Sequence, residues 1–304
     1  MEYVLQTNRL TKKNRNFQAL NGLTMHVPKG AIYGFVGKNG AGKTTLIRLI
    51  CGLQAPTSGD FTLYGIQNNS KNIVKSRRRM GAVVESPSVY LDMSAEENLK
   101  QQYMILGLPS YDGLEELLKL VGLENTGKKK AKHFSLGMKQ RLGIALALVG
   151  EPDFVVLDEP VNGLDPQGIV EMRELLLKLN RERQITILIS SHILDELSRL
   201  ATYYGFIDSG RMVKELSAEE LESACRKCVR VEVTDTGALA RVLDSMKLDY
   251  KIISWTTADI YEKANVTQLA AALAKENCEI ISMQEKDESL ESYYISLLGG
   301  GRNA

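Results

Sequence analysis

Short apolar runs and helical stretches alternate along the first part of the chain. Four runs have the length and apolar character of strands: residues 31–36, 81–84, 154–157 and 185–189. Continuous apolar runs of this length are typical of strands that are buried on both faces of a parallel sheet. Residues 45–50 and 142–148 are expected to form helices, and Gly52 can end the first of them. The pattern therefore predicts an α/β domain.

The pattern changes near residue 217. Beyond it the predicted order is strand 229–233, helix 239–246, strands 250–253 and 259–262, helix 266–276 and strand 278–283. This βαββαβ order is the ferredoxin-like pattern, and a last helix is expected over 289–298. We therefore predict one domain at residues 1–216 and a small accessory α+β domain at residues 217–304. We expect the second domain to serve in packing or dimer contact, and a regulatory ligand domain is the alternative.

Composition narrows the possible partners. The 304 residues allow two cores, and 38 basic residues against 37 acidic ones leave the chain close to neutral. A dedicated nucleic-acid binder is usually basic, so we expect no nucleic-acid partner, and the basic runs at 77–79 and 128–132 are interpreted as solvated faces. No run approaches the roughly 18 apolar residues that a membrane span needs, and no signal region is expected at Met1.

The chain has four cysteines, and Cys225 and Cys228 have the spacing of a metal or redox pair. A structural zinc site needs four ligands, and no second pair of cysteines or histidines stands at ligand spacing. We therefore expect free thiols in a reducing compartment.

The segment 37–44 fits the pattern G-x-x-x-x-G-K-[ST], the loop that binds nucleotide phosphates. It follows a predicted strand and precedes a predicted helix, so backbone N–H groups and the positive helix end would face the phosphates. Lys43 would reach the β and γ phosphates, and the Thr44 hydroxyl would hold Mg²⁺. The predicted nucleotide-binding residues are Gly37, Lys38, Asn39, Gly40, Ala41, Gly42, Lys43, Thr44 and Thr45.

Two acidic residues follow the apolar run at 154–157. Carboxylates at this position lie at the carboxyl end of a buried strand, where open parallel sheets bind ligands. Asp158 suits contact with Mg²⁺, and Glu159 suits the base that polarises an attacking water. A strand that simply runs out into a polar turn is the alternative, and the phosphate loop favours the catalytic interpretation.

Ser135 precedes the predicted helix at 142–148 as a candidate N-cap. Its hydroxyl and the N–H groups of the helix end would form a second anion site. At this point the segment 134–141 resembles the signature motif of ATP-binding cassette (ABC) transporter ATPases. Residues 162–166 are similar to the D-loop of that family, and 190–192 are similar to its switch-histidine strand.

The resemblance covers roughly residues 1–215 and implies a P-loop NTPase ABC nucleotide-binding domain with a helical subdomain around residues 87–150. It also implies that Ser135, Gly137 and Asp165 contact the nucleotide held by a partner subunit, and that His192 contacts the γ-phosphate. The simpler alternatives are a loop role for His192 and a capping role for Asp165. ATP and Mg²⁺ are the implied cofactors.

This sequence departs from the family pattern at several positions. Leu136 and Met138 stand where the family usually has glycine and glutamine. Glu85 replaces a glutamine that touches Mg²⁺ and senses the membrane subunit, so we assign it to the coupling loop and to the metal site. A glutamate here resembles the subgroup of exporters that confer resistance or immunity to peptide antibiotics such as bacitracin and lantibiotics. Asn14 stands where an adenine-stacking tyrosine is common, and we expect Phe17 to pack in the core.

The resemblance implies an ATPase that powers export through separate membrane permease subunits, with a peptide antibiotic as the candidate substrate. A second nucleotide-binding subunit is expected, most simply another copy of the chain, at the cytoplasmic face of the membrane. A soluble ABC protein acting on the ribosome or on nucleic acid is an alternative, but such translation factors usually carry two cassettes and this chain has one phosphate loop. A non-hydrolysing nucleotide switch is the other alternative, and Glu159 argues against it.

Overall fold

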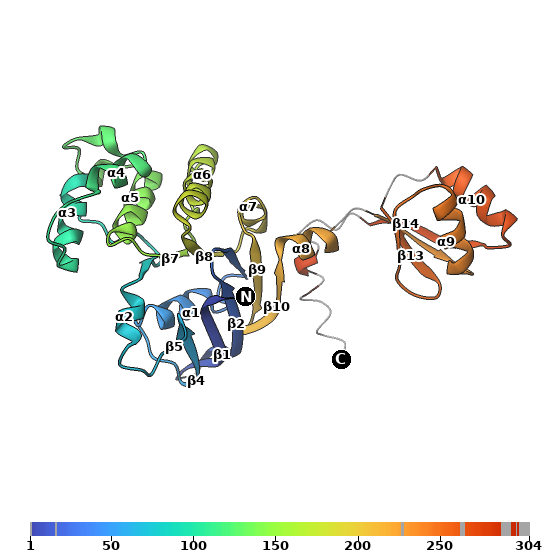
Figure 1. The fold of residues 1–304 in the computed structure, drawn as a ribbon, viewed down its shortest axis with the longest axis horizontal. Coiled ribbons are helices and arrows are strands. Elements are labelled where there is room, and N and C mark those ends of the chain that lie inside the picture. Colours follow the sequence, from blue (N-terminus) through green and yellow to red (C-terminus); the bar gives the residue numbers. More distant parts are fainter. Residues whose placement is uncertain are drawn as a thin grey trace. The chain divides into compact units, whose positions relative to one another are not determined.

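A computed structural model describes residues 2–15, 17–225, 228–261, 265–286, 293–295 and 297. Contacts divide the chain into two compact units, Met1–Ala218 and Glu219–Ala304 (Figure 1). Within these residues, the first unit contains two sheets and a group of helices, and the second contains one sheet with the helices that pack on it.

The central sheet of the first unit has six strands in the order β10-β9-β3-β8-β7-β6. These strands are β3 (Ile32–Val36), β6 (Met80–Val83), β7 (Phe154–Asp158), β8 (Thr186–Ser191), β9 (Tyr203–Asp208) and β10 (Arg211–Ser217). Neighbouring strands run parallel, except that β10 is antiparallel to β9. The four apolar runs predicted as strands form β3, β6, β7 and β8. Because these strands are parallel, their carboxyl ends meet at one edge of the sheet.

A second sheet of the first unit was not predicted. Its strands are antiparallel in the order β2-β1-β4-β5, and they are β1 (Tyr3–Asn14), β2 (Phe17–Pro28), β4 (Ser58–Leu63) and β5 (Ile66–Gln67). Helix α1 (Lys43–Ile50) shares a buried core with residues of both sheets. Two adjacent residue pairs of α1, at positions 46–47 and 49–50, are buried because the helix has neighbours on more than one side.

The helical subdomain lies between β6 and β7 in the sequence, as predicted. It contains α3 (Ala95–Leu106), α4 (Leu114–Leu120), the 3₁₀ turns η1 (Glu124–Thr126) and η2 (Ala131–His133), and α5 (Leu136–Leu148). In Figure 1 these green helices form a group beside the sheets of the same unit. The other helices of the unit are α2 (Ile73–Arg77), α6 (Pro166–Arg183) and α7 (Leu194–Ser198).

The second unit has an antiparallel sheet in the order β12-β13-β11-β14. Its elements are β11 (Cys228–Val233), α9 (Thr236–Ser245), β12 (Tyr250–Ile252), β13 (Thr257–Ile260), α10 (Val266–Lys275) and β14 (Ile280–Lys286), and α8 (Ala218–Ala224) starts at the boundary. Residues of the sheet and of α9 and α10 build its separate core. The helix expected over 289–298 lies mostly outside the described residues.

Two further observations bear on the expectations from sequence. Phe17, expected in the core, is 59% exposed, because it begins the edge strand β2 and pairs with the last residue of β1, Asn14, at the end of the hairpin. That expectation was wrong. Among the residues that the structure describes, no helix is long and apolar enough to cross a membrane.

Candidate functional site

The predicted phosphate loop connects the end of β3 to the start of α1. Gly42 is the N-cap of α1 at a φ of 112°, and a β-carbon there would lie 2.5 Å from the Ala19 carbonyl oxygen, so only glycine fits. Lys43 begins the helix, is 5% exposed, and donates from Nζ to the carbonyl oxygen of Gly37 at 2.6 Å. The remaining predicted contacts, namely Lys38, Asn39, Gly40, Ala41, Thr44 and Thr45, lie in this loop or in the first turn of α1.

Three predicted residues from three elements meet at this loop. Nζ of Lys43 is 3.2 Å from Oε1 of Glu159, and Nδ1 of His192 is 2.8 Å from Oε2 of the same carboxylate. Glu159 follows β7 and His192 follows β8, so the parallel register of these strands brings both to the start of α1. The Glu159 side chain is 19% exposed, so its carboxylate lies in a partly desolvated position between two nitrogen groups.

Asp158 lies at the last position of β7 and is 2% exposed. The Ser190 hydroxyl on β8 donates to Oδ1 of Asp158 at 2.5 Å and accepts from the backbone N–H of Glu159 at 3.0 Å. Ser190 thus orients both acidic residues. In the sequence Ser190 is only a neighbour of His192, and its position opposite Asp158 follows from the register of β7 and β8.

Thr44 and Asp158 supply a hydroxyl and a carboxylate oxygen, which are donors that Mg²⁺ prefers. In the described part of the chain, no group of three or more histidine, cysteine, aspartate and glutamate residues could hold a metal by protein ligands alone. The donor set therefore fits an ion that completes its coordination with water and substrate phosphates. In the part of the chain that the structure describes, Cys225 and Cys228 do not form a disulfide.

Glu85 lies just beyond β6 at a φ of 61°, and its carboxylate pairs with the Arg48 guanidinium on α1. Positive φ is uncommon outside glycine, so the backbone there is held in a sparsely populated conformation. The Glu85 side chain is 57% exposed. Arg48 was missed from the sequence, although it lies four residues after Thr44 on the nucleotide helix.

Ser135 and Asp165 are the N-caps of two neighbouring helices. Ser135 Oγ accepts from the Met138 N–H at 3.2 Å at the start of α5, and Asp165 Oδ1 accepts from the Gly168 N–H at 3.2 Å at the start of α6. Both residues are exposed, and no hydrogen bond or ion pair in the described residues joins Ser135, Gly137 or Asp165 to Lys43. The Ser135 and Asp165 side chains therefore lie at the surface, at the starts of α5 and α6.

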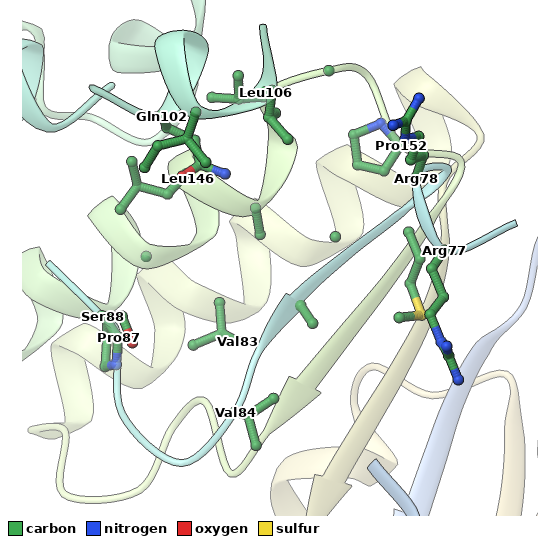
Figure 2. Close-up of a pocket in the computed structure, with 18 of the residues that line it drawn as sticks. Arg77, Arg78, Val83, Val84, Pro87, Ser88, Gln102, Leu106, Leu146 and Pro152 are labelled. Carbon is green, nitrogen blue, oxygen red and sulfur yellow. The ribbon is translucent and has the colours of Figure 1, made fainter. Parts of the chain in front are cut away.

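A cavity of about 630 Å³ lies between the central sheet and the helical subdomain (Figure 2). Val83, Val84 and Pro87 line it on the side of the Glu85 loop, and Leu106 lines it from α3. Arg77 and Arg78 supply the charged side chains of the lining, which contains no carboxylate.

Cys51, the C-cap of α1, lies near Arg77 and Asp158. Burial raises the pKa of the Cys51 thiol to about 11, while Arg77 acts in the opposite direction. The thiol is therefore protonated near neutral pH and is not a nucleophile of this site.

Comparisons with known proteins agree with the geometry. A family model described as "ABC transporter" matches residues 20–162. The bacitracin transport ATP-binding protein BcrA of Enterococcus faecalis is 39% identical over 306 residues, covering 99% of this chain and 98% of that protein. The lantibiotic transport ATP-binding protein SrtF of Streptococcus pyogenes is 42% identical over 212 residues, covering 70% of this chain and 90% of that protein.

Among solved structures, cbiO1 from Clostridium perfringens, part of the ABC transporter complex cbiONQ, superposes with a TM-score of 0.66. It is 28% identical, and the match covers 73% of this chain and 92% of that chain.

Proposed function

We propose a specific task for this chain, which belongs to the family of ABC transporter ATP-binding proteins and is an ATPase whose ATP hydrolysis is coupled to transport. The chain binds ATP and Mg²⁺ on the phosphate loop and drives export of a peptide antibiotic through a separate membrane permease. The observation that carries this proposal is the convergence of Lys43, Glu159 and His192 at the carboxyl edge of the central sheet.

The nucleotide roles follow from the positions of the side chains. Lys43 is anchored by the Gly37 carbonyl at the first turn of α1, so its charge is available to the β and γ phosphates. Thr44 and Asp158 would hold Mg²⁺, and the bound ion would neutralise charge on the phosphates. Glu85 is proposed as a further oxygen donor to the ion, and its carboxylate pairs with Arg48 on the helix that begins at Lys43.

Glu159 acts as the base that orients the attacking water, and His192 is its positioning partner. The 2.8 Å contact from His192 restricts the carboxylate to one orientation, and the Ser190 hydroxyl restrains the backbone of Glu159. A base works only when it is aimed at the proton that it accepts, so both restraints support hydrolysis rather than nucleotide binding alone.

A second subunit, most simply another copy of the chain, completes each site. Ser135, Gly137 and Asp165 are placed at exposed helix ends, where a facing subunit's nucleotide would meet N–H donors and the positive ends of α5 and α6. With Glu159→Gln and ATP, gel filtration should show a dimer that Ser135→Arg abolishes. Equal dimerisation of the arginine variant would overturn the two-subunit site.

The permease docks at the cavity beside Glu85. Val84 and Ser86 flank Glu85 and line this cavity, so an occupant there would contact the coupling loop directly. Docking at this surface would place the chain on the cytoplasmic face of the membrane.

The substrate proposal is supported by Glu85 and by the similarity to the bacitracin and lantibiotic transport ATP-binding proteins. The test is resistance: cells that carry this chain and its membrane permease should tolerate bacitracin or a lantibiotic. The same cells with Glu159→Gln should lose that tolerance. Resistance that survives this substitution, or no resistance to either class of peptide, would contradict the proposal.

The second unit is a ferredoxin-like accessory domain, and we assign residues 1–216 to the ATPase and 217–304 to this module. Its βαββαβ element order and its separate core support that assignment. A packing or dimer-contact role is favoured, because every proposed nucleotide contact lies in the first unit.

A further inference from the structure

Leu136 is the first residue of α5 and lies between Ser135 and Gly137. Its side chain is 45% exposed, which is unusual for leucine on a helix that otherwise supplies core residues.

Leu136 contacts the segment that leads into α6. A β-carbon built on Gly163 would lie 3.1 Å from Cδ2 of Leu136, so a methyl group of Leu136 covers the Gly163 backbone. In the opposite direction, a β-carbon on Gly137 would lie 3.7 Å from Cδ2 of Leu164. The start of α5 and the loop before α6 therefore interlock, with one leucine of each lying against a glycine of the other.

The same two helices are joined a second time beyond this interlock. Nη1 of Arg141 on α5 is 3.5 Å from Oε2 of Glu171 on α6. One contact lies near the N-termini of the helices and the other lies further along them. Together they restrain the position of α5 relative to α6 more than either contact alone.

The sizes of Gly163 and Leu136 are complementary. Gly163 has a φ of 77°, a conformation that other residues adopt at a cost, and a side chain there would approach Leu136 more closely than an ordinary van der Waals contact. The bulk of Leu136 is therefore accommodated because residue 163 has no side chain.

The caps connect this interlock to the outward-facing groups. Ser135 is bound to α5 through the Met138 N–H, and Asp165 is bound to α6 through the Gly168 N–H. Because each cap moves with its own helix, the spacing between the two helix ends sets the spacing between Ser135 and Asp165.

We propose that Leu136 is a positioning residue that holds Ser135 and Gly137 at a defined spacing from Asp165, so that these groups meet the second subunit's nucleotide as one surface. This inference rests on the proposed two-subunit site. Shortening Leu136 loosens the interlock and weakens assembly of the ATP-bound pair. Binding of ATP to the chain's own phosphate loop does not depend on Leu136.

The experiment uses the full-length chain carrying Glu159→Gln and measures dimer formation by gel filtration over a range of ATP concentrations. Leu136→Ala should raise the ATP concentration for half-maximal dimerisation by about tenfold, within the range by which contacting residues couple. Leu136→Met, which keeps the reach of the side chain, should restore it. ATP affinity, measured by equilibrium dialysis on protein too dilute to dimerise, should stay unchanged in both variants.

A matched control is Leu91→Ala, because Leu91 is 49% exposed near the same helical subdomain and makes no part of the interlock. It should behave like the parent. Gly163→Ala should weaken dimerisation, and less so when Leu136→Ala is also present, because the side chain that it meets has been shortened. This non-additivity separates a contact within one chain from a direct contact of Leu136 with the partner.

The outcomes are distinguishable. If Ser135→Arg still dimerises, the proposed two-subunit site is wrong. If Ser135→Arg abolishes the dimer while Leu136→Ala matches Leu91→Ala, or if Leu136 and Gly163 substitutions act additively, only the positioning role is overturned.

Discussion

At the scale of single residues, Glu159 has an environment that suits a base. Lys43 is almost fully buried and contacts one oxygen of the carboxylate, while His192 contacts the other. A buried cation needs compensating partners, and Lys43 has three, the Glu159 carboxylate and the carbonyls of Gly37 and Lys38. Removing the Glu159 charge therefore leaves Lys43 with a hydrogen-bond acceptor, and the loop should keep its shape.

The first prediction follows from this environment. Glu159→Gln should lower ATP turnover by about 10² to 10⁴, because the glutamine cannot accept a proton, while ATP binding stays nearly intact. Steady-state phosphate release and equilibrium ATP binding on the purified chain measure the two effects. Glu174→Gln, at an exposed position of α6, is the control. A variant that hydrolyses ATP at half the normal rate would show that Glu159 is not the base.

The second prediction concerns Glu85 and Arg48. Glu85→Gln removes the charge but keeps an acceptor for Arg48, so basal ATPase should remain within about tenfold, or about 1.4 kcal/mol in the barrier. Export should weaken, because Glu85 lies beside the cavity proposed for the permease. ATPase of the purified chain is compared with substrate efflux from cells that carry the permease, and Arg48→Gln should reproduce the efflux defect. Complete loss of hydrolysis in Glu85→Gln would make Glu85 a catalytic residue instead.

At the scale of elements, helix caps determine where the helical subdomain begins. Ser94 caps α3, its Oγ accepts from the Glu97 N–H at 3.2 Å, and Glu97 Oε2 accepts from the Ser94 N–H at 2.6 Å. Lys130 adds a third contact to Glu97 at 2.9 Å. The Ser94 N–H and then Lys130 lower the pKa of the Glu97 carboxyl from 4.5 to about 2.

The third prediction is a pH dependence at this cap. Because the Glu97 pKa is lower in the folded state, its stabilisation is present above pH 4.5 and is lost as the pH falls toward 2. In urea unfolding, the free energy of unfolding of the parent should therefore fall between pH 4.5 and about 2. The fall should be smaller in Glu97→Gln. At neutral pH, Ser94→Ala should cost about 1 kcal/mol of unfolding free energy. Identical pH profiles for parent and Glu97→Gln would refute the role of the cap.

At the scale of the whole molecule, each of the two units has a core of its own. The phosphate loop, the acidic residues after β7 and the histidine after β8 all lie within Met1–Ala218. Every side chain proposed to contact the nucleotide therefore belongs to the first unit.

The fourth prediction tests that independence. A chain ending at Ala218, which keeps the 3.0 Å hydrogen bond from the Ala218 N–H to the Thr202 carbonyl, should bind ATP with an affinity close to that of the full chain. Equilibrium binding after circular dichroism has confirmed folding is the measurement. A folded truncation that fails to bind ATP would show that residues beyond 218 build part of the site.

The sequence by itself determined the features that depend on residues adjacent in the chain. The apolar runs predicted β3, β6, β7 and β8, and the Ser135 cap was predicted from a small polar residue before a helix. The glycine-rich loop before α1 was recognised for the same reason, because its conformation follows from residues contiguous in the chain.

Tertiary structure alone decided which of these features meet. The sheet containing β1, β2 and β4 was missed because its strands mix apolar and polar residues without strict alternation, and its bulged pairing joins distant segments. Phe17 was expected in the core, yet its burial depends on what packs beside it, and it is exposed. Likewise, the contacts of Arg48 with Glu85 and of Leu136 with Gly163 join residues far apart in sequence, so no local pattern predicts them.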